Sequence, residues 1–242
     1  MVPGTKRPIW CQATQLGISP ILRTKLGYRS TRPLFPRDHH LKEENMPRPH
    51  RPLVTGGWYH VTNRGAARQD IFLSNADRAH FLDLLGDAVW LQEIEIHAYC
   101  LMGNHYHLLA RTPNGNLDRA LHRAMSIYVR KFNERYGRDG PLFKARYFSS
   151  LIEDESYLLA ASRYIHRNPI EFGVSDLASY RWSSYRQFLN RRLRNPWLST
   201  NFTLGLSGGV RGYEAFVEGP LGGAVDYVAA VLRDAGVPGT AA

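Results

Sequence analysis

Residues 97–111, HAYCLMGNHYHLLAR, decide how the surrounding chain is expected to fold. One apolar run ends at Gly103-Asn104, and a second apolar run begins after this pair of turn residues. Two such runs joined by a short turn are typical of a β-hairpin. The sequence therefore predicts antiparallel strands at 94–102 and 105–111.

The two histidines that begin the second strand are the first candidates for a site. Residues two apart on a strand point to the same face of a sheet, so His105 and His107 are expected to project side by side. Two imidazoles on one face make half of a site for a divalent metal. The alternative is a structural pair, with one histidine exposed and the other hydrogen-bonded in the core. A short His-x-His motif alone favours that alternative, and only further ligands elsewhere would reverse it.

The chain on both sides of the hairpin predicts the rest of a sheet. Gly57–Asn63 is rich in aromatic and β-branched residues and reads as a strand. Apolar residues at helical spacing predict one helix that begins at Asn75 or Asp77 and another over Leu117–Tyr136. Pro141–Phe148 is the expected fourth strand. The order strand, helix, strand, strand, helix, strand predicts an α+β, ferredoxin-like (RRM-like) antiparallel sheet with helices on one face.

A third helix is expected from Asp154 to Asn168, where Pro169 stops it. Residues four apart share a helical face, so Tyr164 and Asn168 are neighbours. A phenol can act as a covalent nucleophile, and an amide oxygen can complete a metal site. The alternative is that Tyr164 packs in the core while Asn168 only ends the helix.

Charge narrows the class of partner. The net charge of +10 and the isoelectric point near 9.8 point to nucleic acid, with a membrane surface as the rival polyanion. No apolar run of roughly 18 residues and no signal-like segment is present, so we expect a cytoplasmic protein without a membrane span. Cys11 and Cys100 are too few for a disulfide framework or a cysteine-based zinc site.

Basic side chains cluster in three places where they could contact a phosphate backbone. These are the loop after the first strand, one face of the second helix, and the fourth strand; a merely solvated surface is the alternative for each. The candidates are Arg64, Arg68, Arg119, Arg123, Arg130, Lys131, Lys144 and Arg146.

Composition also suggests domain limits. Residues 1–51 form a basic arm, expected to be disordered because nine Lys and Arg face three Asp and Glu over the first 50 positions. Residues 52–190 form the ordered domain. Residues 191–242 are Gly-rich and read as a small C-terminal appendage, with possible helical segments at 213–217 and 225–232.

Three motifs in this order resemble the REP-associated tyrosine transposases, members of the single-tyrosine HUH nuclease superfamily. They are Tyr99–His107 (YCLMGNHYH), Gly140–Tyr147 (GPLFKARY) and Tyr164–Pro169 (YIHRNP). The resemblance covers roughly residues 56–190 and includes Trp182–Tyr185. One departure is a glycine in the first motif, at the position just before Asn104, where the family commonly has proline.

The resemblance implies a site. A divalent metal, Mg²⁺ or Mn²⁺, would be held by His105, His107 and Asn168, and Tyr164 would be the nucleophile on an added catalytic helix. Tyr157, two helical turns earlier, is the rival nucleophile. We favour Tyr164 because only it has an amide partner four residues later.

The implied function is a metal-dependent single-strand DNA endonuclease and strand transferase. It would form a 5′-phosphotyrosine intermediate on hairpin-forming repeat DNA, associate with the nucleoid, and work as a monomer or homodimer. One alternative is a non-catalytic nucleic-acid-binding protein on the same scaffold, whose sheet-face aromatics stack on bases. Another is a hydrolase that activates water with the metal and forms no covalent intermediate.

Overall fold

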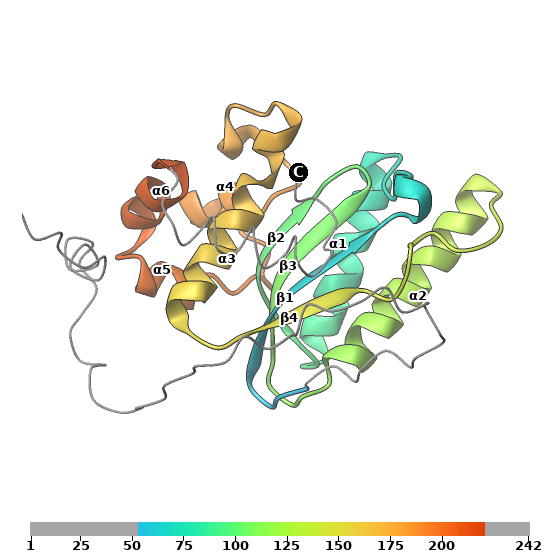
Figure 1. The fold of residues 1–242 in the computed structure, drawn as a ribbon, viewed down its shortest axis with the longest axis horizontal. Coiled ribbons are helices and arrows are strands. Elements are labelled where there is room, and N and C mark those ends of the chain that lie inside the picture. Colours follow the sequence, from blue (N-terminus) through green and yellow to red (C-terminus); the bar gives the residue numbers. More distant parts are fainter. Residues whose placement is uncertain (1–52, 221–242) are drawn as a thin grey trace, which may run out of the picture. The chain divides into compact units, whose positions relative to one another are not determined.

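The computed structural model describes residues 53–220 (Figure 1). The arm expected at 1–51 and the helical segment expected at 225–232 lie outside these residues. Within them, no helix is both long and apolar enough to cross a lipid bilayer.

A four-stranded antiparallel sheet forms the centre of the fold. Its strands are β1 (Gly57–Arg64), β2 (Glu95–Leu101), β3 (His105–Thr112) and β4 (Phe148–Ile152). They lie in the order β2-β3-β1-β4, so the first and third strands are central and adjacent. This order confirms the ferredoxin-like fold expected from the sequence.

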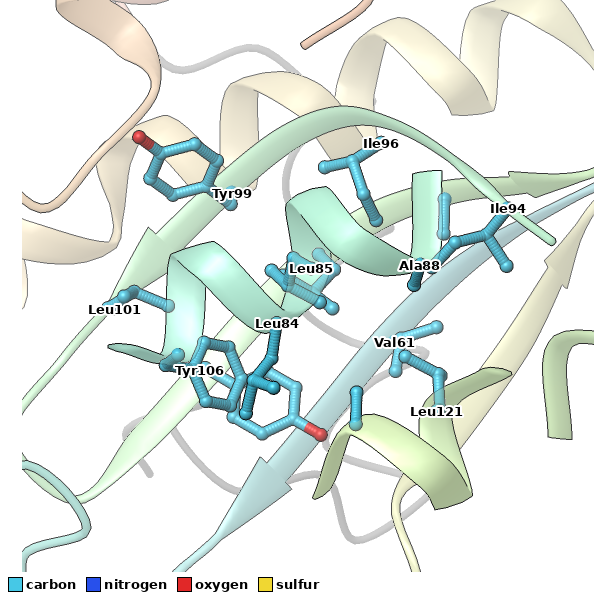
Figure 2. Packing of buried hydrophobic residues seen from close by; sticks show 14 of the residues in the cluster. Val61, Leu84, Leu85, Ala88, Ile94, Ile96, Tyr99, Leu101, Tyr106 and Leu121 are labelled. Atoms are coloured by element: carbon cyan, nitrogen blue, oxygen red, sulfur yellow. The ribbon is translucent and has the colours of Figure 1, made fainter. Parts of the chain in front are cut away.

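Two helices cover one face of the sheet. Helix α1 (Asn75–Trp90) begins with a capping box between Ser74 and Asp77, and α2 (Leu117–Tyr136) ends at Gly137 in the left-handed conformation. Figure 2 shows apolar side chains of α1 packed on sheet residues of this face. The labelled contributors include Val61, Leu84, Leu85, Ala88, Ile96, Tyr106 and Leu121.

The opposite face is covered by a third helix. Helix α3 (Glu155–Arg167) is capped by Asp154, whose carboxylate accepts from the backbone N–H of Tyr157. Figure 1 shows α3 on the side of the sheet away from α1 and α2. Side chains along a strand alternate between the two faces of the sheet. The strand residues that face α3 are therefore the neighbours of those that face α1 and α2. The apolar cluster on this face contains Ala98, Cys100, Met102, Leu109, Leu158, Ala161, Tyr164 and Ile165.

The fourth strand lies later in the chain than predicted. Pro141–Phe148 was expected to be this strand, and the structure instead pairs Phe148–Ile152 with β1. The preceding segment makes an isolated bridge, between Phe143 and Gly65. The hydrogen bonds between strands come from the backbone, so Ser149 and Ser150 can pair with β1 although they carry no strand-like pattern.

The C-terminal part of the described chain packs against α3 and against α4 (Tyr185–Leu189). The segment expected to be helical at 213–217 lies within α6 (Val210–Glu218). Helix α3 passes at its end into a 3₁₀ turn that begins at Asn168. The remaining elements are η3 (Ala66–Arg68), η4 (Asn168–Phe172), η5 (Leu177–Ser179), α4 (Tyr185–Leu189), η6 (Arg191–Leu193), α5 (Asn201–Leu206) and α6 (Val210–Glu218).

Candidate functional site

The structure brings together the four residues singled out in the two halves of the sequence. His105 and His107 project from β3 toward α3, and their ring centroids are 5.2 Å apart. Tyr164, on α3, places its ring edge-on to His107 at 5.5 Å. The Nε2 atom of His105 lies 3.1 Å from Oδ1 of Asn168. Strand β3, helix α3 and the residue that directly follows this helix thus supply all four side chains.

The contacts of His105 define which of its nitrogens carries the proton. Its Nδ1 atom lies 2.7 Å from Oδ1 of Asn104, and the amide nitrogen of Asn104 donates to the backbone oxygen of Arg68. Oδ1 of Asn168 is also only an acceptor, and a neutral imidazole has one proton, so only one of the two contacts of His105 can be a hydrogen bond. We assign the proton to Nδ1, because its contact is the shorter one, and Nε2 then keeps a lone pair. That lone pair faces Oδ1 of Asn168, while the Nδ2 atom of Asn168 is buried without a partner. With the proton on Nδ1 of His105, two acceptors face each other, an arrangement that a shared cation would satisfy.

His107 contacts a third histidine that sequence reasoning missed. Its Nδ1 atom lies 2.9 Å from Nε2 of His60, a fully buried residue of β1, and the two rings stack at 5.1 Å. The Nε2 atom of His107 is buried with no hydrogen-bond partner. Strand alternation places His60 on the face opposite Tyr59, but only the pairing of β1 with β3 shows that it reaches His107.

All three imidazoles are neutral at physiological pH. Burial lowers the pKa of His60 to about 3 and that of His105 to about 4. Burial also holds the pKa of His107 well below 6.5, and the neighbouring His60 and His105 lower it further. Neutral imidazoles have a lone pair to offer a metal. Among the described residues, no three His, Cys, Asp or Glu side chains form a metal-binding group, so the expected site depends on the Asn168 amide.

Tyr164 lies inside the site rather than on the surface. Its side chain is 6 % exposed, and its ring also meets the edge of His60 at 5.8 Å. The guanidinium of Arg64 is close enough to interact electrostatically with Tyr164 and Glu171. Burial, followed by the charge of Arg68, lowers the pKa of Arg64. Tyr157, two turns earlier on α3, packs against the apolar cluster of this sheet face.

Half of the predicted DNA-binding cations lie at this end of the sheet. Arg64 pairs with His105 across β1 and β3, and its backbone oxygen accepts from the N–H of Lys144. Arg68 is exposed in the loop above the β2–β3 turn, where its φ angle is +61°. Arg146 is exposed on the same segment as Lys144.

The other half lie on α2, which covers the opposite face of the sheet. Arg119 and Arg123 both pair with Glu93, at 3.6 Å and 2.9 Å, so part of their charge is already balanced. Arg130 and Lys131 are exposed. The structure therefore does not bring the α2 cations to the histidines.

Further cations gather beside the edge of β2. The guanidinium carbons of Arg78 and Arg181 lie 5.7 Å and 5.0 Å from the ring centroid of Trp182. The backbone oxygen of Trp182 accepts from the N–H of Leu101 at the end of β2. A groove of about 280 Å³ beside them is also lined by Arg186. Sequence reasoning did not find this cluster, because Arg78 lies far from Arg181 and Trp182 in the sequence and only the fold brings them together.

The buried histidines predict how stability depends on pH. Burial lowers the pKa of His60 and of His166 to about 3, below 6.5 in an unfolded chain. Between these pH values the unfolded state binds more protons, so the free energy of unfolding falls as pH drops below 6.5. Each histidine contributes at most about 1.4 kcal/mol per pH unit.

Denaturant unfolding of metal-free protein from pH 7 to pH 5 measures this slope. His166 is held by Ser184 Oγ at 2.7 Å and by Tyr213 OH at 2.7 Å, away from the histidine pair. The His166→Gln variant is expected to show a shallower slope than wild type. An unchanged slope would contradict the assignment of His166 as a neutral buried group.

Comparisons with known proteins agree with this fold. Residues 53–168 match the family model of IS200-like transposases. The chain is also similar to a solved structure of a REP-associated tyrosine transposase bound to a REP hairpin, with a TM-score of 0.51 and 18% identity over 64% of this chain and 93% of that chain. No curated protein matches the sequence. The resemblance seen in the sequence is thereby confirmed, and residues 53–168 of this chain are similar to IS200-like transposases.

Proposed function

We propose that this protein is a metal-dependent single-strand DNA endonuclease and strand transferase with Tyr164 as its nucleophile. The observation that carries the proposal is the convergence of Tyr164, the two histidines of β3 and the Asn168 amide in one buried site. A non-catalytic binding protein on this scaffold has no use for this combination. Binding of DNA without any covalent product would favour that alternative.

The residues present fit a divalent metal. The Nε2 atom of His107 is a buried acceptor without a partner, and Nε2 of His105 and Oδ1 of Asn168 are acceptors that face each other. These three atoms would hold Mg²⁺ or Mn²⁺. Their donor set carries no charge, so the ion's full positive charge remains available to the substrate. When bound, such an ion withdraws charge from the scissile phosphate and orients it for attack.

Tyr164 supplies the covalent step. Its phenolic oxygen would attack the phosphorus and form an O–P bond while the bond from phosphorus to the 3′ oxygen breaks. The phenol would lose one proton and the leaving 3′ oxygen would take one up, so the step balances. The products are a 5′-phosphotyrosine link and a free 3′-hydroxyl. A free phenol has a pKa of about 10, so the reaction depends on the positioning of this side chain. The new bond is again a phosphodiester, so a second 3′-hydroxyl can reverse the step and join strands without an external energy source.

We propose that the cations beside the site bind the DNA strand that is cleaved. Arg64 lies close to Tyr164, and Arg68, Lys144 and Arg146 flank it, so they can hold phosphates on either side of the reacting one. The α2 cations are on the other sheet face and can provide only general electrostatic attraction. The similar solved protein is bound to a REP hairpin, and we propose hairpin-forming single strands as the substrate class here. Because one chain supplies the tyrosine and all three ligands, a monomer can cleave DNA.

A covalent-adduct assay tests the proposed function. Purified protein is incubated with Mn²⁺ and a single strand that contains a hairpin and is labelled at its 3′ end, and then separated under denaturing conditions. We expect a labelled protein band that disappears when a chelator is added. Strand cleavage without a covalent band would favour the water-activating hydrolase. Binding without cleavage, and unaffected by the chelator, would favour the non-catalytic protein.

A further inference from the structure

The contact between His60 and His107 joins a residue of unassigned role to the candidate metal site. His60 pairs with Leu109 across β1 and β3, which places it diagonally next to His107 on the same sheet face. Both side chains are fully buried, and Nε2 of His60 lies 2.9 Å from Nδ1 of His107. The two β strands hold these nitrogens in hydrogen-bonding position.

A histidine that binds a metal through one nitrogen must keep its proton on the other. Second partners commonly accept that proton and so fix the tautomer and the orientation of the ring. If Nδ1 of His107 donates to Nε2 of His60, the lone pair of His107 is left at Nε2. That atom has no hydrogen-bond partner in the structure. The reverse tautomer would place a proton on Nε2 and remove it from use as a ligand.

The other ligand of the strand shows the same arrangement. Nδ1 of His105 contacts Oδ1 of Asn104, which can only accept, and the Asn104 amide is itself held by the backbone oxygen of Arg68. Each histidine of the pair thus has its Nδ1 atom occupied and its Nε2 atom turned to the site. His60 contacts Nδ1 of His107 as Asn104 contacts Nδ1 of His105.

We propose that His60 is a positioning residue, which accepts the Nδ1 proton of His107 and thereby keeps Nε2 of His107 available to the metal. This inference rests on the proposed metal site. His60 is not itself a ligand, because its Nε2 atom is engaged by His107 and the described residues contain no metal-binding group of three histidines. To accept the proton of His107, residue 60 needs only an acceptor atom at the position of Nε2.

Two variants separate the acceptor from the bulk of the side chain. In His60→Gln the amide oxygen can reach the position of Nε2 and still accept a proton, whereas His60→Phe keeps a ring and loses the acceptor. The affinity of each full-length metal-free protein for Mn²⁺ is measured from the unbound Mn²⁺ signal in electron paramagnetic resonance. We expect His60→Phe to bind about 10- to 100-fold more weakly than wild type. We expect His60→Gln to stay close to wild type.

The outcomes distinguish this inference from the proposed function. Wild-type protein that binds no Mn²⁺ would remove the metal site itself. Wild-type protein that binds Mn²⁺ no better than His60→Phe would leave the metal site standing and overturn the role of His60. Equal weakening in both variants would also overturn it, since packing rather than proton acceptance would then be responsible.

A measurement on the wild-type protein covers the case in which His60→Phe does not fold. Long-range proton–nitrogen correlation spectra of the metal-free protein report which nitrogen of each neutral histidine carries the proton. We expect His107 to be protonated at Nδ1. A proton on Nε2 of His107 would overturn the inference.

Discussion

Replacing Tyr164 by phenylalanine is expected to abolish the covalent protein–DNA adduct. Phenylalanine keeps the ring that meets the edges of His60 and His107 at 5.8 Å and 5.5 Å, and it lacks only the attacking oxygen. Loss of a covalent nucleophile lowers rates by on the order of 10³-fold or more in other enzymes. Adduct yield under single-turnover conditions, with Mn²⁺ and a labelled hairpin strand, measures the effect.

The matched control is Tyr157→Phe, the same chemical change two turns earlier on α3. Tyr157 packs with the apolar cluster, and we expect its variant to form adduct as wild type does. Both variants should bind the hairpin strand and unfold close to the wild-type midpoint, because removal of one hydroxyl costs about 1 kcal/mol. Adduct from Tyr164→Phe together with its loss in Tyr157→Phe would move the nucleophile to Tyr157.

The elements that build the site were largely predictable, because each depends on local periodicity. The observed bounds of α2, Leu117–Tyr136, equal the predicted ones, and β1 and β3 differ from the prediction by one residue at an end. Alternation along β3 brings His105 and His107 to one face, and helical spacing brings Tyr164 near Asn168. Each of these relations spans at most four residues, so it needs no knowledge of the fold.

Relations between elements were harder to predict, and His60 shows why. Its side chain reaches His107 because β1 and β3 pair in one register, and a shift of one residue would turn His60 to the opposite face. Nothing within β1 determines that register. The position of the α2 cations relative to the histidines was hard to predict for a similar reason. The helical face that carries Arg119 and Arg123 was predictable, but the side of the sheet covered by α2 depends on packing.

Replacing Asn168 by leucine is expected to remove most of the stabilisation that a metal confers and to leave the metal-free protein as stable as wild type. In the metal-free site Oδ1 of Asn168 faces the lone pair of His105, and Nδ2 is buried without a partner. Leucine has a similar shape and removes both polar groups of the amide, so the metal-free variant should lose little stability. Wild type at a metal concentration of about 100 times Kd should gain about 2.7 kcal/mol in free energy of unfolding. Asn168→Leu should gain far less.

Thermal or denaturant unfolding with and without Mn²⁺ measures both quantities, and Asn168→Asp is the control. Aspartate keeps an oxygen ligand and adds a negative charge, so the metal should stabilise this variant at least as much as wild type. The alternative role of Asn168, as a residue that only ends α3, predicts the opposite pattern. In that case leucine would destabilise the metal-free protein, and the increment from Mn²⁺ would be the same in all three proteins. The metal-free measurement therefore separates a ligand, which costs stability until the ion binds, from a cap, which contributes stability throughout.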